Sequence, residues 1–88
     1  MKLIYLNYTL CELAYQTHEE HLFEREWYIN VDSIKYVEIE NNQLNFIFKD
    51  GKIEKFYKDD LRGNKDKYLK NYDEILEILK LNKIRVNE

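Results

Sequence analysis

The chain has 88 residues, of which 44% are hydrophobic and 15% aromatic, and its formal net charge is −3 at pH 7. This length predicts one domain, and the apolar content is enough for a packed core, which excludes an intrinsically disordered chain. The mildly acidic balance excludes a global drive toward nucleic acid. The one cysteine, Cys11, excludes an internal disulfide and fits a reducing cytoplasm, and no apolar run is long enough for a membrane span.

Residues 1–31 are predicted to form N-terminal strands. Residues 1–10 are rich in Leu and Tyr, which suits a strand buried on much of both faces. Residues 26–31 alternate, with Trp27 and Ile29 on one side and Tyr28 on the other. Both segments therefore favour β-structure.

The segment between them, residues 9–24, fits two structures. Thr9 and Glu12 match the capping box that begins a helix. The rival is one long hairpin, whose first strand continues to about Tyr15, whose turn lies near residues 17–20 and whose second strand returns from Leu22. We favour the hairpin, because apolar and polar side chains alternate on both sides of the predicted turn.

Residues 34–58 carry the strongest local signal, because two dipeptides that accept positive φ separate three β-prone runs. These dipeptides are Asn41-Asn42 and Asp50-Gly51. Such dipeptides between alternating runs are typical of two-residue hairpin turns. The segment is therefore predicted to be a three-stranded antiparallel meander.

Two-residue turns at both places would give the meander one continuous apolar face. That predicted face consists of Val37, Ile39, Leu44, Phe46, Phe48, Ile53 and Tyr57. The opposite face would carry Tyr36 opposite Ile47, with Phe56 one strand over. A slip of one residue would turn an apolar set to water, so the register is strongly specified.

Residues 65–81 are predicted to form a helix, since Leu69, Tyr72, Leu76 and Leu79 recur at helical spacing. Either Asn64 or Asn71 could be its N-cap. The alternation at residues 84–86 is typical of a short extra edge strand. The predicted fold class is therefore α+β: an antiparallel β-meander of four to six strands with a C-terminal helix packed on one face.

A family resemblance rests on three stretches: residues 28–34, the Lys49-Asp-Gly-Lys52 turn and the helical run at residues 73–79. Together these stretches resemble the FlbD-like small flagellar proteins and their short phage relatives. The family pattern lacks the insertion at residues 10–25 and the charged loop at residues 58–67. The resemblance implies a small β-meander-plus-helix fold with no catalytic residues.

No constellation of residues predicts catalysis, a metal or a cofactor. Cys11, His18 and His21 are the only cluster of metal-ligand types, and histidines three apart could share a helix face. No second cluster completes a four-ligand set, so we interpret this region as an exposed polar tip. Scattered carboxylates and isolated glycines predict neither acid–base chemistry nor a phosphate-binding loop. The chain is therefore predicted not to be an enzyme.

Two groups of residues are candidates for binding a partner protein or a second copy of the chain. One is the outer-face trio Tyr36, Ile47 and Phe56. The other is acidic, in a segment where residues 12–26 hold five glutamates and one arginine. Its predicted members are Glu19, Glu20, Glu24 and Glu26. Polarised charge of this kind favours association with a charged partner.

The alternative is a nucleic-acid-binding regulator that uses a basic sheet edge and loop. Residues 49–70 hold eight basic and five acidic side chains. The predicted contacts are Lys49, Lys52, Lys58, Arg62, Lys65 and Lys67. Glutamates on the same sheet face argue against it, because phosphate binding needs a positive potential. The first prediction is thus a small non-enzymatic cytoplasmic protein acting by protein–protein interaction, such as a phage or mobile-element regulator or inhibitor of a host protein.

Overall fold

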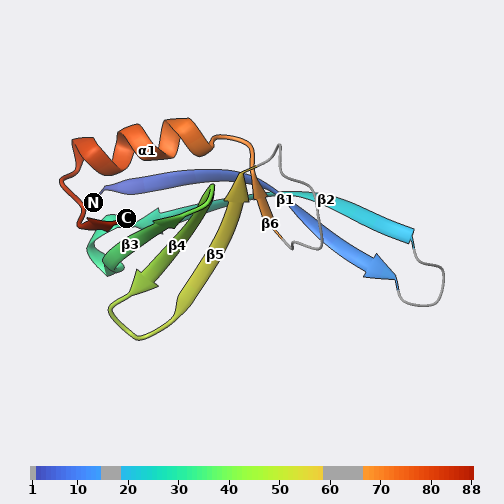
Figure 1. Ribbon diagram of the computed structural model, residues 1–88, viewed down its shortest axis with the longest axis horizontal. Helices are drawn as coiled ribbons and strands as arrows, with labels where there is room; N and C mark the ends of the chain where they lie inside the picture. The colour runs from blue at the N-terminus through green and yellow to red at the C-terminus, as the bar shows by residue number, and fades with distance from the viewer. Residues whose placement is uncertain (1, 15–18, 59–66) are drawn as a thin grey trace.

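The protein is described by a computed structural model that covers residues 2–14, 19–58 and 67–88. Within these residues one seven-stranded sheet carries a single α-helix (Figure 1). The elements in chain order are β1 (Leu3–Ala14), β2 (Glu19–Asn30), the 3-10 turn η1 (Val31–Ser33), β3 (Ile34–Glu40), β4 (Gln43–Phe48), β5 (Ile53–Lys58), β6 (Lys67–Leu69), α1 (Tyr72–Leu81) and β7 (Val86–Asn87).

The sheet is mixed and has seven strands among the described residues, so the predicted fold class, an antiparallel β-meander of four to six strands, is wrong. The three strands predicted within residues 34–58 are antiparallel neighbours, β3, β4 and β5. The strand order of the sheet is β2-β1-β6-β5-β4-β3-β7, and both the β5–β6 and the β3–β7 pairs are parallel. The parallel partners β6 and β7 are only three and two residues long. Strands this short have no readable alternation, and their pairing depends on contacts between distant parts of the chain. The α+β composition of the prediction remains.

β1 and β2 confirm the hairpin that we favoured for residues 9–24 over a helix. Every residue from Leu3 to Ala14 pairs with one from Asn30 back to Glu19. The turn predicted near residues 17–20 falls partly outside the described residues. Figure 1 shows this hairpin extending well past the remaining strands, with β6 beside only part of β1. Beyond Leu10, therefore, the described residues of the hairpin pair only with each other.

The first turn of the meander has the predicted geometry. Asn41 and Asn42 have φ angles of 39° and 62°, as a two-residue hairpin turn requires. Glu40 consequently pairs with Gln43 and Val37 with Phe46, as predicted.

The second turn differs from the prediction by one residue. Phe48 N donates to Lys52 O at 2.9 Å, and Lys52 N donates to the Asp50 side chain at 2.9 Å, so the loop is longer than Asp50-Gly51. Ile53 therefore pairs with Ile47 instead of Phe48. This slip reverses the faces of β5. Ile53, predicted to be in the core, is 56% exposed, whereas Phe56, predicted to be on the outer face, is fully buried.

The helix begins at Tyr72, which corrects the predicted start at residue 65. Lys67–Leu69 is strand β6, which pairs with residues 8–10 of β1. Asn71 is the N-cap residue, yet its side chain makes no capping bond. Its Oδ1 accepts from Asn7 N at 3.0 Å, and its Nδ2 donates to Tyr5 O at 2.9 Å. The amide thus continues the β6 ladder along β1 for one more step.

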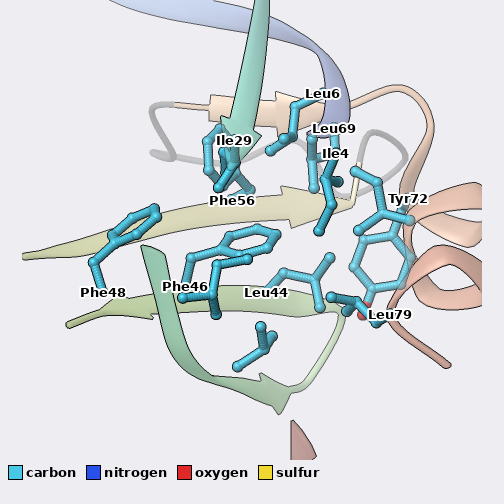
Figure 2. Packing of buried hydrophobic residues seen from close by; sticks show 13 residues of the cluster. Ile4, Leu6, Ile29, Leu44, Phe46, Phe48, Phe56, Leu69, Tyr72 and Leu79 are labelled. Carbon is cyan, nitrogen blue, oxygen red and sulfur yellow. The ribbon is translucent and has the colours of Figure 1, made fainter. Parts of the chain in front are cut away.

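The core lies between the curled sheet and α1 (Figure 2). The hairpin contributes Ile4, Leu6 and Ile29, which face the side chains of β4 and β5. Tyr72, Ile75 and Leu79 cover them from the helix, and all three are buried. No helix among the described residues is long and apolar enough to cross a membrane. The core packing holds the β1–β2 hairpin against β4, β5 and α1, and β2 remains at the border of the sheet.

Candidate functional site on strand β2

β2 is a long edge strand with an outward-facing row of backbone groups. Within the described part of the chain it ends the strand order, and its one partner is β1. Val31 N donates to Lys2 O at 3.0 Å, and successive residues of an antiparallel strand point their backbone groups alternately. The residues of β2 bonded to β1 are thus Ile29, Trp27, Arg25 and Phe23. The backbone groups of Leu22, Glu24, Glu26 and Tyr28 point away from β1, and we call this row the β2 edge.

The side chains of β2 are as accessible as its backbone. All eight residues from 21 to 28 are exposed. Four of them are large and apolar: Leu22, Phe23, Trp27 and Tyr28, with exposed fractions of 48, 37, 36 and 57%. Leu22 and Tyr28 lie on the outer face and Phe23 and Trp27 on the inner face, so each face of this edge strand presents two exposed apolar side chains. Exposed apolar residues on an edge strand are typical of a strand that takes up a partner.

Beside this edge lies a pocket of about 410 Å³, which we call the Trp27 pocket. Its lining consists of Trp27, Ser33, Phe48, Lys49, Asp50, Lys52 and Glu54. The Trp27 ring lies 6.1 Å from Phe48 and 6.2 Å from Phe56, between centroids. The pocket therefore has an aromatic wall and a charged rim from the β4–β5 turn.

A second hollow, of about 250 Å³, shares Trp27 and Glu54 with the Trp27 pocket. Its other lining residues are Tyr8, Glu26 and Lys67. The Lys67 ammonium lies 2.5 Å from Glu54 Oε2 and 4.6 Å from the centroid of the Phe56 ring. This lysine is held by a carboxylate and an aromatic face. The two hollows are thus neighbours on either side of Trp27 and Glu54.

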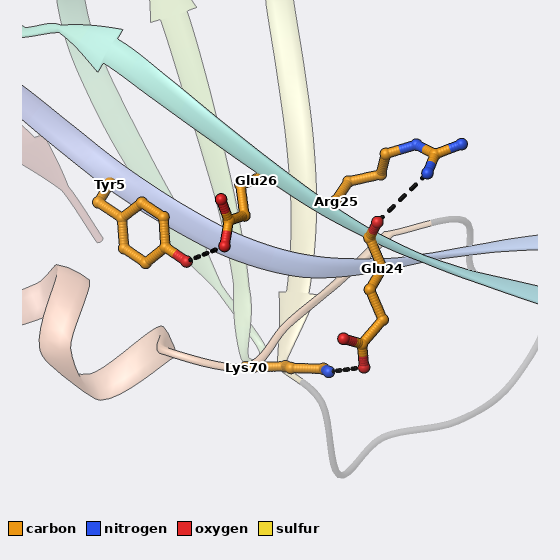
Figure 3. Close-up of polar contacts among 5 residues, drawn as sticks. All are labelled: Tyr5, Glu24, Arg25, Glu26 and Lys70. Atoms are coloured by element: carbon orange, nitrogen blue, oxygen red, sulfur yellow. Dashed lines mark hydrogen bonds and ion pairs between the residues drawn. The ribbon is translucent and has the colours of Figure 1, made fainter.

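The outer face of β2 carries acidic side chains that make contacts within the chain (Figure 3). The Tyr5 hydroxyl donates to Glu26 Oε1 at 2.9 Å, and this bond raises the pKa of Tyr5 above 10.0. Glu24 forms an ion pair with Lys70 across β1. The Arg25 guanidinium donates to the Glu24 carbonyl at 3.2 Å, which agrees with an outward direction for that carbonyl.

The four predicted acidic residues all belong to β2. Glu24 and Glu26 share its outer face, because the residue between them points to the other side. The side chains of Glu19 and Glu20 lie outside what the structure describes, although their backbone is in β2.

The predicted outer-face trio is not an open apolar surface. Tyr36 pairs with Ile47 as expected, and the Arg85 guanidinium lies 5.8 Å from the Tyr36 ring centroid. Ile47 is only 9% exposed. The assignment of Phe56 to this face is wrong, because the slip at the second turn places its ring against Phe46, 5.8 Å away.

The predicted basic residues do not gather in one place. Lys49 and Lys52 flank the β4–β5 turn, whereas Lys58 ends β5 and lies over the Tyr72 ring at 5.7 Å. The length of β5 separates them by about 20 Å. Lys67 is paired with Glu54, and Arg62 and Lys65 fall outside the described residues. The described lysines therefore offer no continuous track for phosphates.

The suggested metal ligands are also apart. Cys11 pairs with Leu22 and Glu12 with His21, so the Cys11 and His21 side chains lie on opposite faces of the ribbon. His18 is outside the described residues. Among the residues that the structure describes, no three His, Cys, Asp or Glu side chains are placed to hold a metal ion.

Sequence reasoning predicted β2 but missed its role as an exposed edge. β2 lies at the edge because β6 pairs with the other side of β1, and no local sequence pattern predicts that pairing. One signal was available, because apolar residues fall on both faces of residues 22–28 among glutamates. A strand that is apolar on both faces is usually buried on both by neighbouring elements. Residues 21–28 of β2 are instead exposed.

A comparison with protein-family models finds no match, and comparisons with curated proteins and with solved structures find none either. The resemblance to FlbD-like proteins therefore stays a prediction. The function has to be argued from the β2 edge and its pocket.

Proposed function

We propose that this protein acts without catalysis, as a small cytoplasmic regulator or inhibitor that binds another polypeptide through the β2 edge. The observation that carries the proposal is the row of outward backbone groups on β2, within a stretch of eight exposed residues. Strands of this kind either carry protective features or take up another strand.

The protection on β2 is incomplete. Edge strands are usually blunted by charged side chains, by inward charges, by proline or by being short, and β2 has the first two, with Arg25 as its inward charge. The chain has no proline, and β2 is twelve residues long. Arg25 covers one carbonyl of the edge. By contrast, the opposite border strand, β7, has two residues. These features support strand addition at β2.

Proline at Glu24 tests this proposal. The Glu24 N–H points outward, so proline removes an edge donor and keeps the ladder to β1. The wild-type protein and the Glu24→Pro variant are each immobilised on a support and incubated with an extract of the source cells. We expect the wild type to capture a partner protein that Glu24→Pro fails to capture. Glu24→Ala, which loses the same carboxylate but keeps the N–H, should retain more of the partner than Glu24→Pro.

Circular dichroism must show that both variants are folded. Leu81→Ser removes another exposed apolar side chain, on α1 and away from β2, and should capture as well as the wild type. Equal capture by Glu24→Pro and wild type would refute the proposal that the β2 edge carries the function.

A further inference from the structure

Resting on the proposed function, we infer that the β2 edge takes an extended peptide in which basic and apolar residues alternate. The basic side chains lie beside the glutamates of the outer face, and an apolar side chain occupies the Trp27 pocket. Three observations carry this inference: the direction of the edge, the division of charge between its two faces and the position of the pocket.

A strand added to β2 would continue the pleat of the sheet. Its side chains would alternate between the same two faces. On the outer face they would lie beside Glu24 and Glu26. On the inner face they would lie beside Arg25 and Trp27, and of these two Trp27 lines the Trp27 pocket. The two faces therefore favour different side chains at alternate positions of the bound peptide.

The outer face favours basic side chains in the bound peptide. Among the described side chains of β2, the outer face carries Glu24 and Glu26, whereas Arg25 lies on the inner face. The Glu24 side chain remains 76% exposed although it pairs with Lys70. Lysine or arginine opposite these carboxylates forms favourable cross-strand pairs, and acidic residues there are repelled.

The inner face favours one large apolar side chain of the bound peptide, which would occupy the Trp27 pocket. The Trp27 pocket opens between β2 and the β4–β5 turn, and its volume of about 410 Å³ accommodates an aromatic ring. Trp27 and Phe48 supply its aromatic wall. A phenylalanine inserted here would stack on aromatic rings with its backbone bonded to the β2 edge. Such a pocket gives specificity to strand addition, while the backbone bonds give affinity.

The same charges disfavour a second copy of this chain as the occupant. Antiparallel pairing of two β2 strands would bring two glutamate-rich segments together, and like charges across an interface oppose binding. The occupant is therefore a basic peptide segment of a different protein.

Trp27 supplies the test, because it is the one tryptophan of the chain and lines the pocket. The probe is the acetylated and amidated peptide Lys-Val-Lys-Phe-Lys-Val-Lys, titrated into the full chain while tryptophan fluorescence is recorded. Its matched control is Glu-Val-Glu-Phe-Glu-Val-Glu. We expect a saturable change with the lysine peptide, weakened by added salt, and none with the glutamate peptide.

Two variants separate the parts of the inference. Glu24→Pro should weaken binding of the lysine peptide by about fivefold or more, since it removes an edge donor worth about one net hydrogen bond. Leu81→Ser should bind like the wild type.

Three results would overturn the inference: equal responses to the two peptides, an unchanged affinity of Glu24→Pro, or a dimer of the free protein that Glu24→Pro dissociates. Failure of the peptide with partner capture still sensitive to Glu24→Pro refutes this inference and leaves the proposed function standing. Capture that is insensitive to Glu24→Pro refutes the proposed function itself.

Discussion

Truncation of Phe56 to alanine should cost a large part of the stability of this domain. The ring is fully buried, and its centroid lies 5.2 Å from Tyr8, 5.8 Å from Phe46 and 6.2 Å from Trp27. Loss of a buried Phe costs about 3–5 kcal/mol through lost transfer energy and the cavity left behind. Lost aromatic pairs, at about 0.5–1.5 kcal/mol each, favour the upper end.

A domain of this length has a total stability of only about 4–13 kcal/mol. Urea denaturation of Phe56→Ala should therefore show a large fall in the midpoint or an unfolded protein in buffer. Ile53→Ala is the matched control, because Ile53 lies three residues earlier on the same strand and is 56% exposed. Its loss should be below about 1 kcal/mol. If Ile53→Ala cost more than Phe56→Ala, the observed β4–β5 register would be wrong.

Three further substitutions test other parts of the structure. Phe46→Ala, at a fully buried mid-strand position, should cost about 3–5 kcal/mol in urea denaturation, and a loss under about 1 kcal/mol would contradict the core. Asn71→Ala should cost about 1–3 kcal/mol, because it leaves Asn7 N and Tyr5 O without their partner; Asn71→Asp, which keeps the acceptor for Asn7 N, should lose less. Burial raises the pKa of Tyr72, so above pH 10 the unfolded chain releases this proton before the folded chain does, and stability falls as pH rises toward the folded pKa. Tyr72→Phe should weaken this alkaline loss in denaturation curves between pH 9 and 11, and an unchanged pH dependence would contradict the assignment.

The sequence was most informative where the interactions are local. Asn41-Asn42 predicted the first hairpin and its register, because few residues other than asparagine and glycine tolerate consecutive positive φ angles. Alternation and the lack of a continuous helical stripe favoured the β1–β2 hairpin. Asn71 was recognised as one possible helix start, although its side chain bonds to β1 instead of capping α1.

The errors arose where two alternatives had similar local support. Residues 53–57 would place apolar side chains on both faces of a strand, Ile53 and Tyr57 on one face and Phe56 on the other. Alternation alone therefore could not decide which face is buried. The Asp50 side chain accepts from Lys52 N and lengthens the turn, which settles the matter in favour of Phe56.

The parallel strands and the candidate site share one further cause. β6 reaches β1 and β5 only through long-range pairing, and that pairing fills one side of β1 and leaves β2 at the border. The glutamates of the candidate site were therefore predicted from charge, but the edge and the Trp27 pocket were not. Both of these features exist only after distant segments have come together.

Amide hydrogen exchange along β2, resolved by residue with NMR, shows directly whether the β2 edge is open. In the free protein the amides of Glu24, Glu26 and Tyr28 should exchange much faster than those of Arg25, Trp27 and Ile29, because only the second set is bonded to β1. Saturation with the lysine peptide should slow the first set and leave the second unchanged. Uniform protection of both sets in the free monomer would contradict an open edge on β2.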